Sequence, residues 1–138
     1  MRRRCSMLET VAVRTSAREE FIDITSLVRS FIDNNSLKDG LITVYVPHTT
    51  AGVTVNENAD PDVTRDILDK LHREIPQRDG YLHAEGNSDA HIKASLLGSS
   101  VQIIVSAGKP LLGTWQAVYF CEFDGPRQRK VILKAVSG

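Results

Sequence analysis

Hydrophobic and polar residues follow two different periods along this chain, and each period predicts one kind of element. Short runs rich in β-branched residues, several of them alternating apolar and polar side chains, are typical of strands. In 113–123, for example, Trp115, Ala117 and Tyr119 share one face, whereas Gln116 and Glu122 share the other. The predicted strands cover residues 7–15, 20–24, 41–46, 53–57, 101–105, 113–123 and 131–136.

Three other segments place apolar residues three and four positions apart, which is the period of a helix with one buried stripe. Thr25 is predicted to cap the first, and Asp60 followed by Pro61 marks the start of the second. Helices that interrupt a mainly antiparallel set of strands define an α+β fold. The predicted helices cover residues 25–34, 61–75 and 88–98.

Composition narrows the class of protein and its partners. The chain has 138 residues, 41% of them hydrophobic and 25% charged, which suits one globular domain over residues 7–138 behind a flexible tail at 1–6. A formal net charge of zero argues against nucleic acid or a membrane surface as partner. No apolar run has the length of a membrane span, and no signal peptide is evident. With Cys5 and Cys121 expected to be free thiols, these features predict a cytoplasmic protein.

The stretch 81–91 concentrates the candidate chemistry: two histidines, two carboxylates and a glycine. Its first half is predicted to be extended, which would put His83 and Glu85 on one face. Asn87 or Ser88 is predicted to cap the following helix, and His91 then falls in the first turn, where the helix dipole favours a neutral imidazole. Such a histidine can ligate a metal or bind an anionic substrate, although structural histidines are common and the spacing matches no known zinc signature.

The segment 47–52 is the second candidate. It joins two predicted strands through small residues, a glycine and His48. Small residues permit a ligand to approach backbone N–H groups, although an ordinary hairpin connection has the same composition.

Five motifs in order resemble those of one known family. They are Pro47-His48-Thr49-Thr50-Ala51-Gly52, Asn56-Glu57, His83-x-Glu85-Gly86-Asn87-x-x-x-His91, Leu112-Gly113-Thr114-Trp115-Gln116 and Glu122-Phe123-Asp124-Gly125-Pro126-Arg127. On these motifs the chain resembles the YjbQ family, often labelled secondary thiamine-phosphate synthase, over about residues 7 to 136. The resemblance implies sandwich-like β-sheets packed with helices, a homotrimer, and a pocket between subunits lined by the motif residues.

The resemblance also implies a reaction. An aminopyrimidine methyl diphosphate is joined to a thiazole phosphate, which requires cationic groups or a metal on the leaving diphosphate and alignment of the two rings. A divalent metal is expected, and histidine ligands favour zinc or another transition metal over magnesium. The predicted metal ligands are His48, His83 and His91; the predicted catalytic residues are Glu57, Glu85 and His91; and the predicted substrate- or phosphate-binding residues are Thr49, Thr50, Gly52, Asn87, Gln116 and Arg127.

Two alternatives use the same residues. A metal-dependent hydrolase would activate a bound water with a glutamate as the base. A non-catalytic module would bind a small phosphorylated metabolite through the same anion sites and would need neither Glu57 nor Glu85.

Overall fold

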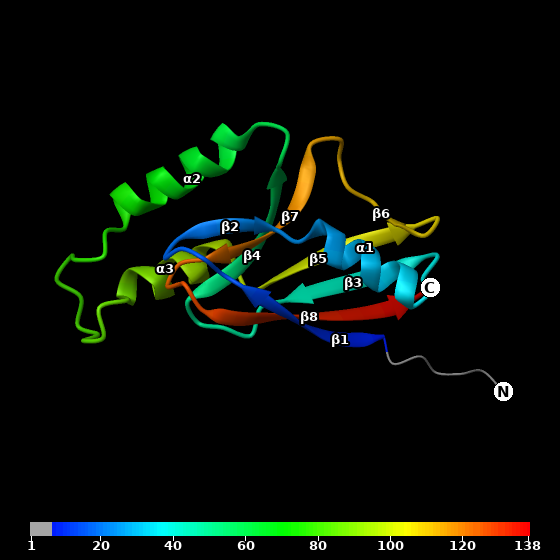
Figure 1. Cartoon of the computed structure of the whole chain (residues 1–138), viewed down its shortest axis with the longest axis horizontal. Helices are drawn as coiled ribbons and strands as arrows, with labels where there is room; N and C mark the ends of the chain where they lie inside the picture. The colour runs from blue at the N-terminus through cyan, green and yellow to red at the C-terminus, as the bar shows by residue number, and fades with distance from the viewer. Residues whose placement is uncertain (1–6) are drawn as a thin grey trace.

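Two antiparallel β-sheets and three helices form the structure (Figure 1). The computed structural model describes residues 7–138; the predicted tail and Cys5 lie outside that range. The α+β class with antiparallel sheets is confirmed. Along residues 7–138, no helix is both long and apolar enough to cross a membrane.

The larger sheet has five strands in the order β1-β8-β3-β5-β6, and the smaller has three in the order β2-β7-β4. Every pairing is antiparallel. The strands of the larger sheet are β1 (Leu8–Arg14), β8 (Gln128–Ser137), β3 (Gly40–Tyr45), β5 (Ser100–Ser106) and β6 (Lys109–Pro110). Those of the smaller sheet are β2 (Glu20–Asp23), β7 (Gln116–Glu122) and β4 (Ala51–Glu57).

The three helices are α1 (Thr25–Asn34), α2 (Pro61–Glu74) and α3 (Ser88–Leu97). The predicted cap of α2 is confirmed, because the Asp60 side chain accepts a hydrogen bond from the backbone N–H of Asp62. Asn87 holds the N-cap position of α3. The predicted cap of α1 is wrong: Ile24 is the N-cap, and Thr25 instead accepts a hydrogen bond from the backbone N–H of Val118 at 2.9 Å.

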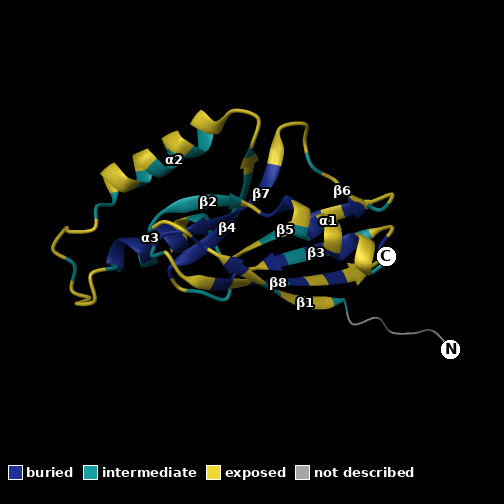
Figure 2. Cartoon of the chain, in the orientation of Figure 1, coloured by how far each residue is buried: buried dark blue, intermediate teal, exposed yellow. Residues whose placement is uncertain are grey.

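The main core lies between the inner faces of the two sheets and α1. Strand β7 is buried on both faces, since Val118 and Phe120 enter this core while Ala117, Tyr119 and Cys121 enter a second cluster against α3 (Figure 2). The strand is shorter than predicted, and Trp115, expected on its apolar face, precedes it and is 61% exposed.

Helix α2 is the most weakly packed element. Its predicted apolar stripe exists, but no residue of the helix is buried (Figure 2). Only Leu68 and Leu71 pack against the second cluster, both partly exposed. The helix therefore offers apolar surface on the isolated chain.

Candidate functional site

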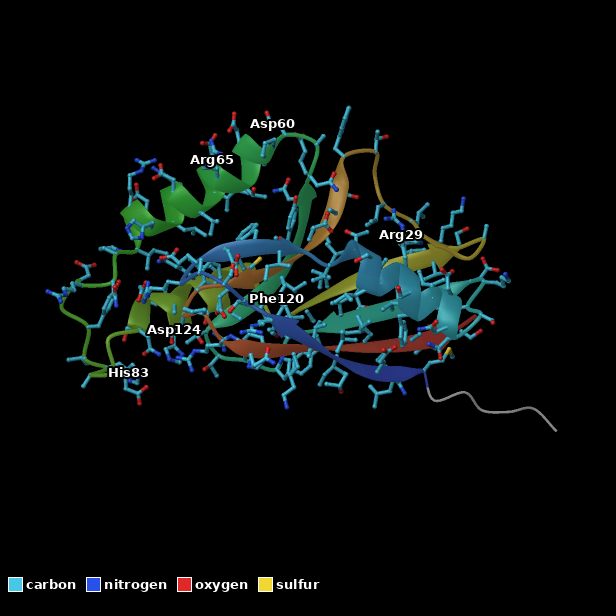
Figure 3. All side chains as sticks on the ribbon, in the orientation of Figure 1. Arg29, Asp60, Arg65, His83, Phe120 and Asp124 are labelled. Atoms are coloured by element: carbon cyan, nitrogen blue, oxygen red, sulfur yellow. The ribbon has the colours of Figure 1, made fainter. Side chains whose placement is uncertain are left out.

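Two histidines of the predicted site, His83 and His91, lie together at the N-terminal end of α3. The prediction of extended chain over 81–85 is wrong: the segment has a bend at Leu82 and a turn at Ala84 and Glu85, and Gly86 reverses the chain with a φ of +80°. The reversal nevertheless brings His83 and His91 together, with ring centroids 5.3 Å apart and nearly perpendicular planes. Glu85 Oε2 lies 3.7 Å from His83 Nε2. The three side chains form an open cluster at one end of the molecule, where Figure 3 labels His83 on the loop before α3.

His48 lies on the loop between β3 and β4. It lines a cavity of about 500 Å³ together with His91, Thr49, Ser95 and Ser99. Burial, and then the neighbouring Arg129 cation, lower the pKa of His48. Within residues 7–138, no three His, Cys, Asp or Glu side chains converge closely enough to hold a metal ion together. The structure thus pairs His83 with His91 and gives His91 and His48 a common cavity.

A buried ion pair that the sequence pattern does not predict supports the His48 loop. Glu122 and Arg129 have side chains 0% and 5% exposed. Arg129 Nε donates to Glu122 Oε1 at 2.9 Å, and Arg129 Nη2 donates to Thr50 Oγ1 at 2.8 Å. Thr15 Oγ1 donates to Glu122 Oε1 at 2.7 Å. Thr50, a predicted phosphate-binding residue, is therefore buried and already hydrogen-bonded.

The ionic state of this pair follows from its contacts. Burial alone would favour a protonated Glu122 carboxyl group. Hydrogen bonds from Arg129 and Thr15 outweigh that effect and lower the pKa of Glu122 below its ordinary value. The carboxylate and the guanidinium are consequently both charged at neutral pH.

Asn87 and Arg127 meet on one carboxylate. Asn87 Nδ2 donates to Asp124 Oδ2 at 2.9 Å, and Arg127 Nη2 donates to the same oxygen at 2.8 Å. Asp124 lies at the same end of the molecule as His83 (Figure 3). This contact brings two of the predicted phosphate-binding residues together, although each of them already donates a hydrogen bond to Asp124.

Gly52 has a packing role in this structure. A Cβ atom at this position would lie 2.7 Å from the carbonyl oxygen of Gly98, so β4 approaches the end of α3 only because residue 52 lacks a side chain. Thr49 is exposed and, like His48, lines the cavity, so it can contact a ligand directly.

Glu57 and Gln116 lie at the far end of the smaller sheet. They pair with each other at one end of the β4–β7 ladder, while Ala51 pairs with Glu122 at the other. The strand rise of about 3.3 Å per residue separates the ends of β4 by about 20 Å. One chain therefore does not bring these two predicted site residues to the histidines.

A second buried charge network underlies α3 and also escaped prediction. Lys93 and Asp89 have fully buried side chains. Lys93 Nζ donates to Asp89 Oδ2 at 3.0 Å and to Glu19 Oε1 at 3.1 Å. Arg18 donates to both oxygens of Asp89, at 3.1 and 3.2 Å. The network ties the first turn of α3 to the β1–β2 connection and so fixes the backbone around His91.

Together these features define a small α+β protein with a histidine-bearing cavity beside a helix start. The sequence profile of the UPF0047 protein YjbQ-like family matches residues 9–138. The chain belongs to this family, and the resemblance drawn from the five motifs is confirmed.

Relatives from distant organisms match nearly end to end. A UPF0047 protein of Methanocaldococcus jannaschii is 53% identical over 130 residues, which cover 94% of each chain. The UPF0047 protein YugU of Bacillus subtilis is 47% identical over 93% of this chain and 98% of its own.

Solved structures show the same fold. A YjbQ/UPF0047 family protein of Clostridium acetobutylicum superposes with a TM-score of 0.91 at 57% identity, covering 93% of this chain and 99% of that one. A YbjQ-like protein of Sulfolobus solfataricus gives a TM-score of 0.90 at 29% identity, covering 95% and 96%.

Proposed function

We propose that the cavity between the β3–β4 loop and α3 binds a small phosphorylated metabolite, and that a divalent transition metal bound beside it makes the protein an enzyme. The contact of His83 with His91, with Glu85 next to His83, carries this proposal. Two imidazoles and a carboxylate are a donor set that suits zinc or a similar ion better than magnesium. All three side chains are at least partly exposed, so an ion from solution can reach them.

The roles of the residues follow from their places. His83 and His91 would hold the metal, and Glu85 would complete the site or orient His83. A metal there would supply Lewis-acid stabilisation of charge on a phosphoryl oxygen. Thr49, exposed at the cavity, and Asn87 with Arg127, on Asp124, are the groups available to the phosphate. Joining an aminopyrimidine methyl diphosphate to a thiazole phosphate is one reaction with such needs, and metal-dependent hydrolysis is another.

Metal content tests this proposal. The purified, untagged protein is expected to bind zinc at close to one ion per chain after incubation and desalting, measured by elemental analysis. His83→Ala and His91→Ala are each expected to lose most of the metal, because two ligands remain at best. His72→Ala is the matched control, since this histidine is exposed on α2 and pairs with Glu19. Equal zinc in all four proteins would contradict the site.

A non-catalytic binding module is the second candidate, and the placement of Glu57 favours it. That predicted catalytic carboxylate lies about 20 Å from the His48 loop along β4. Glu85→Gln separates the two candidates, because it removes a carboxylate that an enzyme needs and leaves the anion-binding groups intact. Phosphate binding unchanged by Glu85→Gln, with no turnover by either protein, would favour the module.

We also propose the homotrimer that the resemblance implies. The half-exposed apolar stripe of α2 and the exposed Trp115 support burial against a second copy. A partner could then supply Glu57 and Gln116 to the histidine cluster. Light scattering at micromolar concentration is expected to give three chain masses. A mass of one chain would contradict the homotrimer and, with it, the proposed pocket between subunits.

A further inference from the structure

One ring nitrogen of His48 is already in use. The backbone N–H of Lys130 donates to His48 Nε2 at 3.0 Å. The contact follows from the sheet: the pairing of β3 with β8 ends at Tyr45 and Ile132, so β8 continues past β3 without a strand on that side. The His48 ring takes the place of the missing strand and satisfies a backbone donor.

This contact fixes the tautomer of the imidazole. A ring nitrogen that accepts an N–H bond carries no proton, so the proton of the neutral ring is on Nδ1. A doubly protonated ring would direct its own Nε2–H at the N–H of Lys130. The lowered pKa of His48 agrees with a neutral ring.

The tautomer does not fit a metal ligand. A metal binds an imidazole through a nitrogen lone pair. The lone pair of Nε2 points at Lys130, and Nδ1 holds a proton. Metal binding by His48 would require loss of the Lys130 contact and a shift of the proton.

We propose that His48 is a hydrogen-bond donor, whose Nδ1–H binds a phosphoryl oxygen of the ligand in the cavity, and not a ligand of the metal. The inference rests on the proposed function, because it assigns His48 a part in the same cavity. Among the residues that the structure describes, none accepts a hydrogen bond from His48 Nδ1.

The surrounding charges favour an anion at this place. Arg129 and Lys130 are the cations acting on His48, against one carboxylate, Glu122. No aspartate or glutamate lines the cavity, whereas the hydroxyls of Thr49 and Ser99 add donors. A neutral donor in a field of net positive charge binds a phosphoryl oxygen without an ion pair of its own.

Nuclear magnetic resonance of protein whose histidines carry nitrogen-15 reports the tautomer of each imidazole directly. The long-range couplings of His48 are expected to show a protonated Nδ1 and an unprotonated Nε2 at neutral pH. Titration with inorganic phosphate is expected to move the Nδ1 resonance of His48. Protonation on Nε2 would overturn the inference, and so would a confirmed Nδ1–H tautomer whose resonance does not respond to phosphate.

Two amide variants distinguish the role of Nδ1 from that of Nε2 in phosphate binding. The amide nitrogen of asparagine lies as many bonds from Cα as Nδ1 does, and the amide of glutamine reaches the position of Nε2. Inorganic phosphate is expected to bind His48→Asn within about 3-fold of the wild type, whereas His48→Gln is expected to lose about 10- to 100-fold, the range for a hydrogen bond to a charged group. Equal losses in both variants would overturn the role of Nδ1–H.

A zinc titration keeps this inference distinct from the proposed function. Zinc affinity is expected to be unchanged in His48→Asn and lost in His91→Ala. A loss in His48→Asn as large as in His91→Ala would make His48 a metal ligand and overturn the inference. No zinc binding by the wild type would contradict the proposed metal site and leave the tautomer result standing by itself.

Discussion

Replacing Arg129 with methionine is expected to lower the free energy of unfolding by about 3–5 kcal/mol, the usual result of removing one member of a buried ion pair. Methionine keeps much of the length of the side chain but leaves the fully buried Glu122 without its cation. It also leaves Thr50 Oγ1 without its donor. Urea unfolding followed by far-ultraviolet circular dichroism measures the change.

Two further proteins make the result specific. Arg127→Met removes an arginine two positions away that is half exposed and bonded to Asp124, so a loss below about 1 kcal/mol is expected. The double variant Arg129→Met/Glu122→Leu removes both charges and is expected to recover most of the stability lost in the single variant. If Arg129→Met costs no more than Arg127→Met, the pair does not stabilise the fold.

The elements were predictable because their periods are local. The strand and helix patterns depend on residues two to four positions apart, and most boundaries agree within a few residues. The two-residue β6 has no period to detect and was missed. The cap of α1 was misplaced because Thr25 bonds the backbone of β7, which is distant in sequence.

The buried charges could not be predicted in the same way. Glu122 is predicted on the face of strand 113–123 that carries Gln116, and Arg129 precedes the predicted strand 131–136, so neither charged residue is predicted to be buried. What buries them is contact with Thr15 and Thr50, residues brought by other segments of the chain. The residues next to Glu122 and Arg129 in the sequence do not indicate these long-range hydrogen bonds.

In the site too, contacts between residues close in sequence were predictable, whereas the positions of residues far apart in sequence were not. His83 and His91 were predicted to act together, and they do lie together, because only seven residues, including Gly86 at the turn, connect them. The conformation of 81–85 was nevertheless wrong, since alternation over five polar and apolar residues also occurs in turns. Glu57 was placed with the histidines by the family resemblance alone, and strand β4 keeps it at a distance within one chain.

Lys93→Met is the second change with a large expected effect, a loss of about 3–5 kcal/mol in the free energy of unfolding. Lys93 is fully buried, and its ammonium group bonds the carboxylates of Asp89 and Glu19. Without it, Arg18 is left to pair with both carboxylates, and the exposed His72 also contacts Glu19. Lys70→Met is the matched control: that lysine is exposed on α2 and pairs with Glu74, so a change within about 0.5 kcal/mol is expected.

The pH dependence identifies the cause of that loss. Burial opposes ionisation of Asp89, but hydrogen bonds from Arg18 and Lys93 outweigh it and lower its pKa in the folded protein. A depressed carboxyl pKa stabilises the fold above the unfolded value of about 4, and this stabilisation is lost as pH falls through the folded value. The difference between the wild type and Lys93→Met is therefore expected to shrink below about pH 4, where protonation removes the uncompensated charge. A difference that stays constant with pH would assign the loss to packing, because a poorly fitting methionine destabilises the protein at every pH.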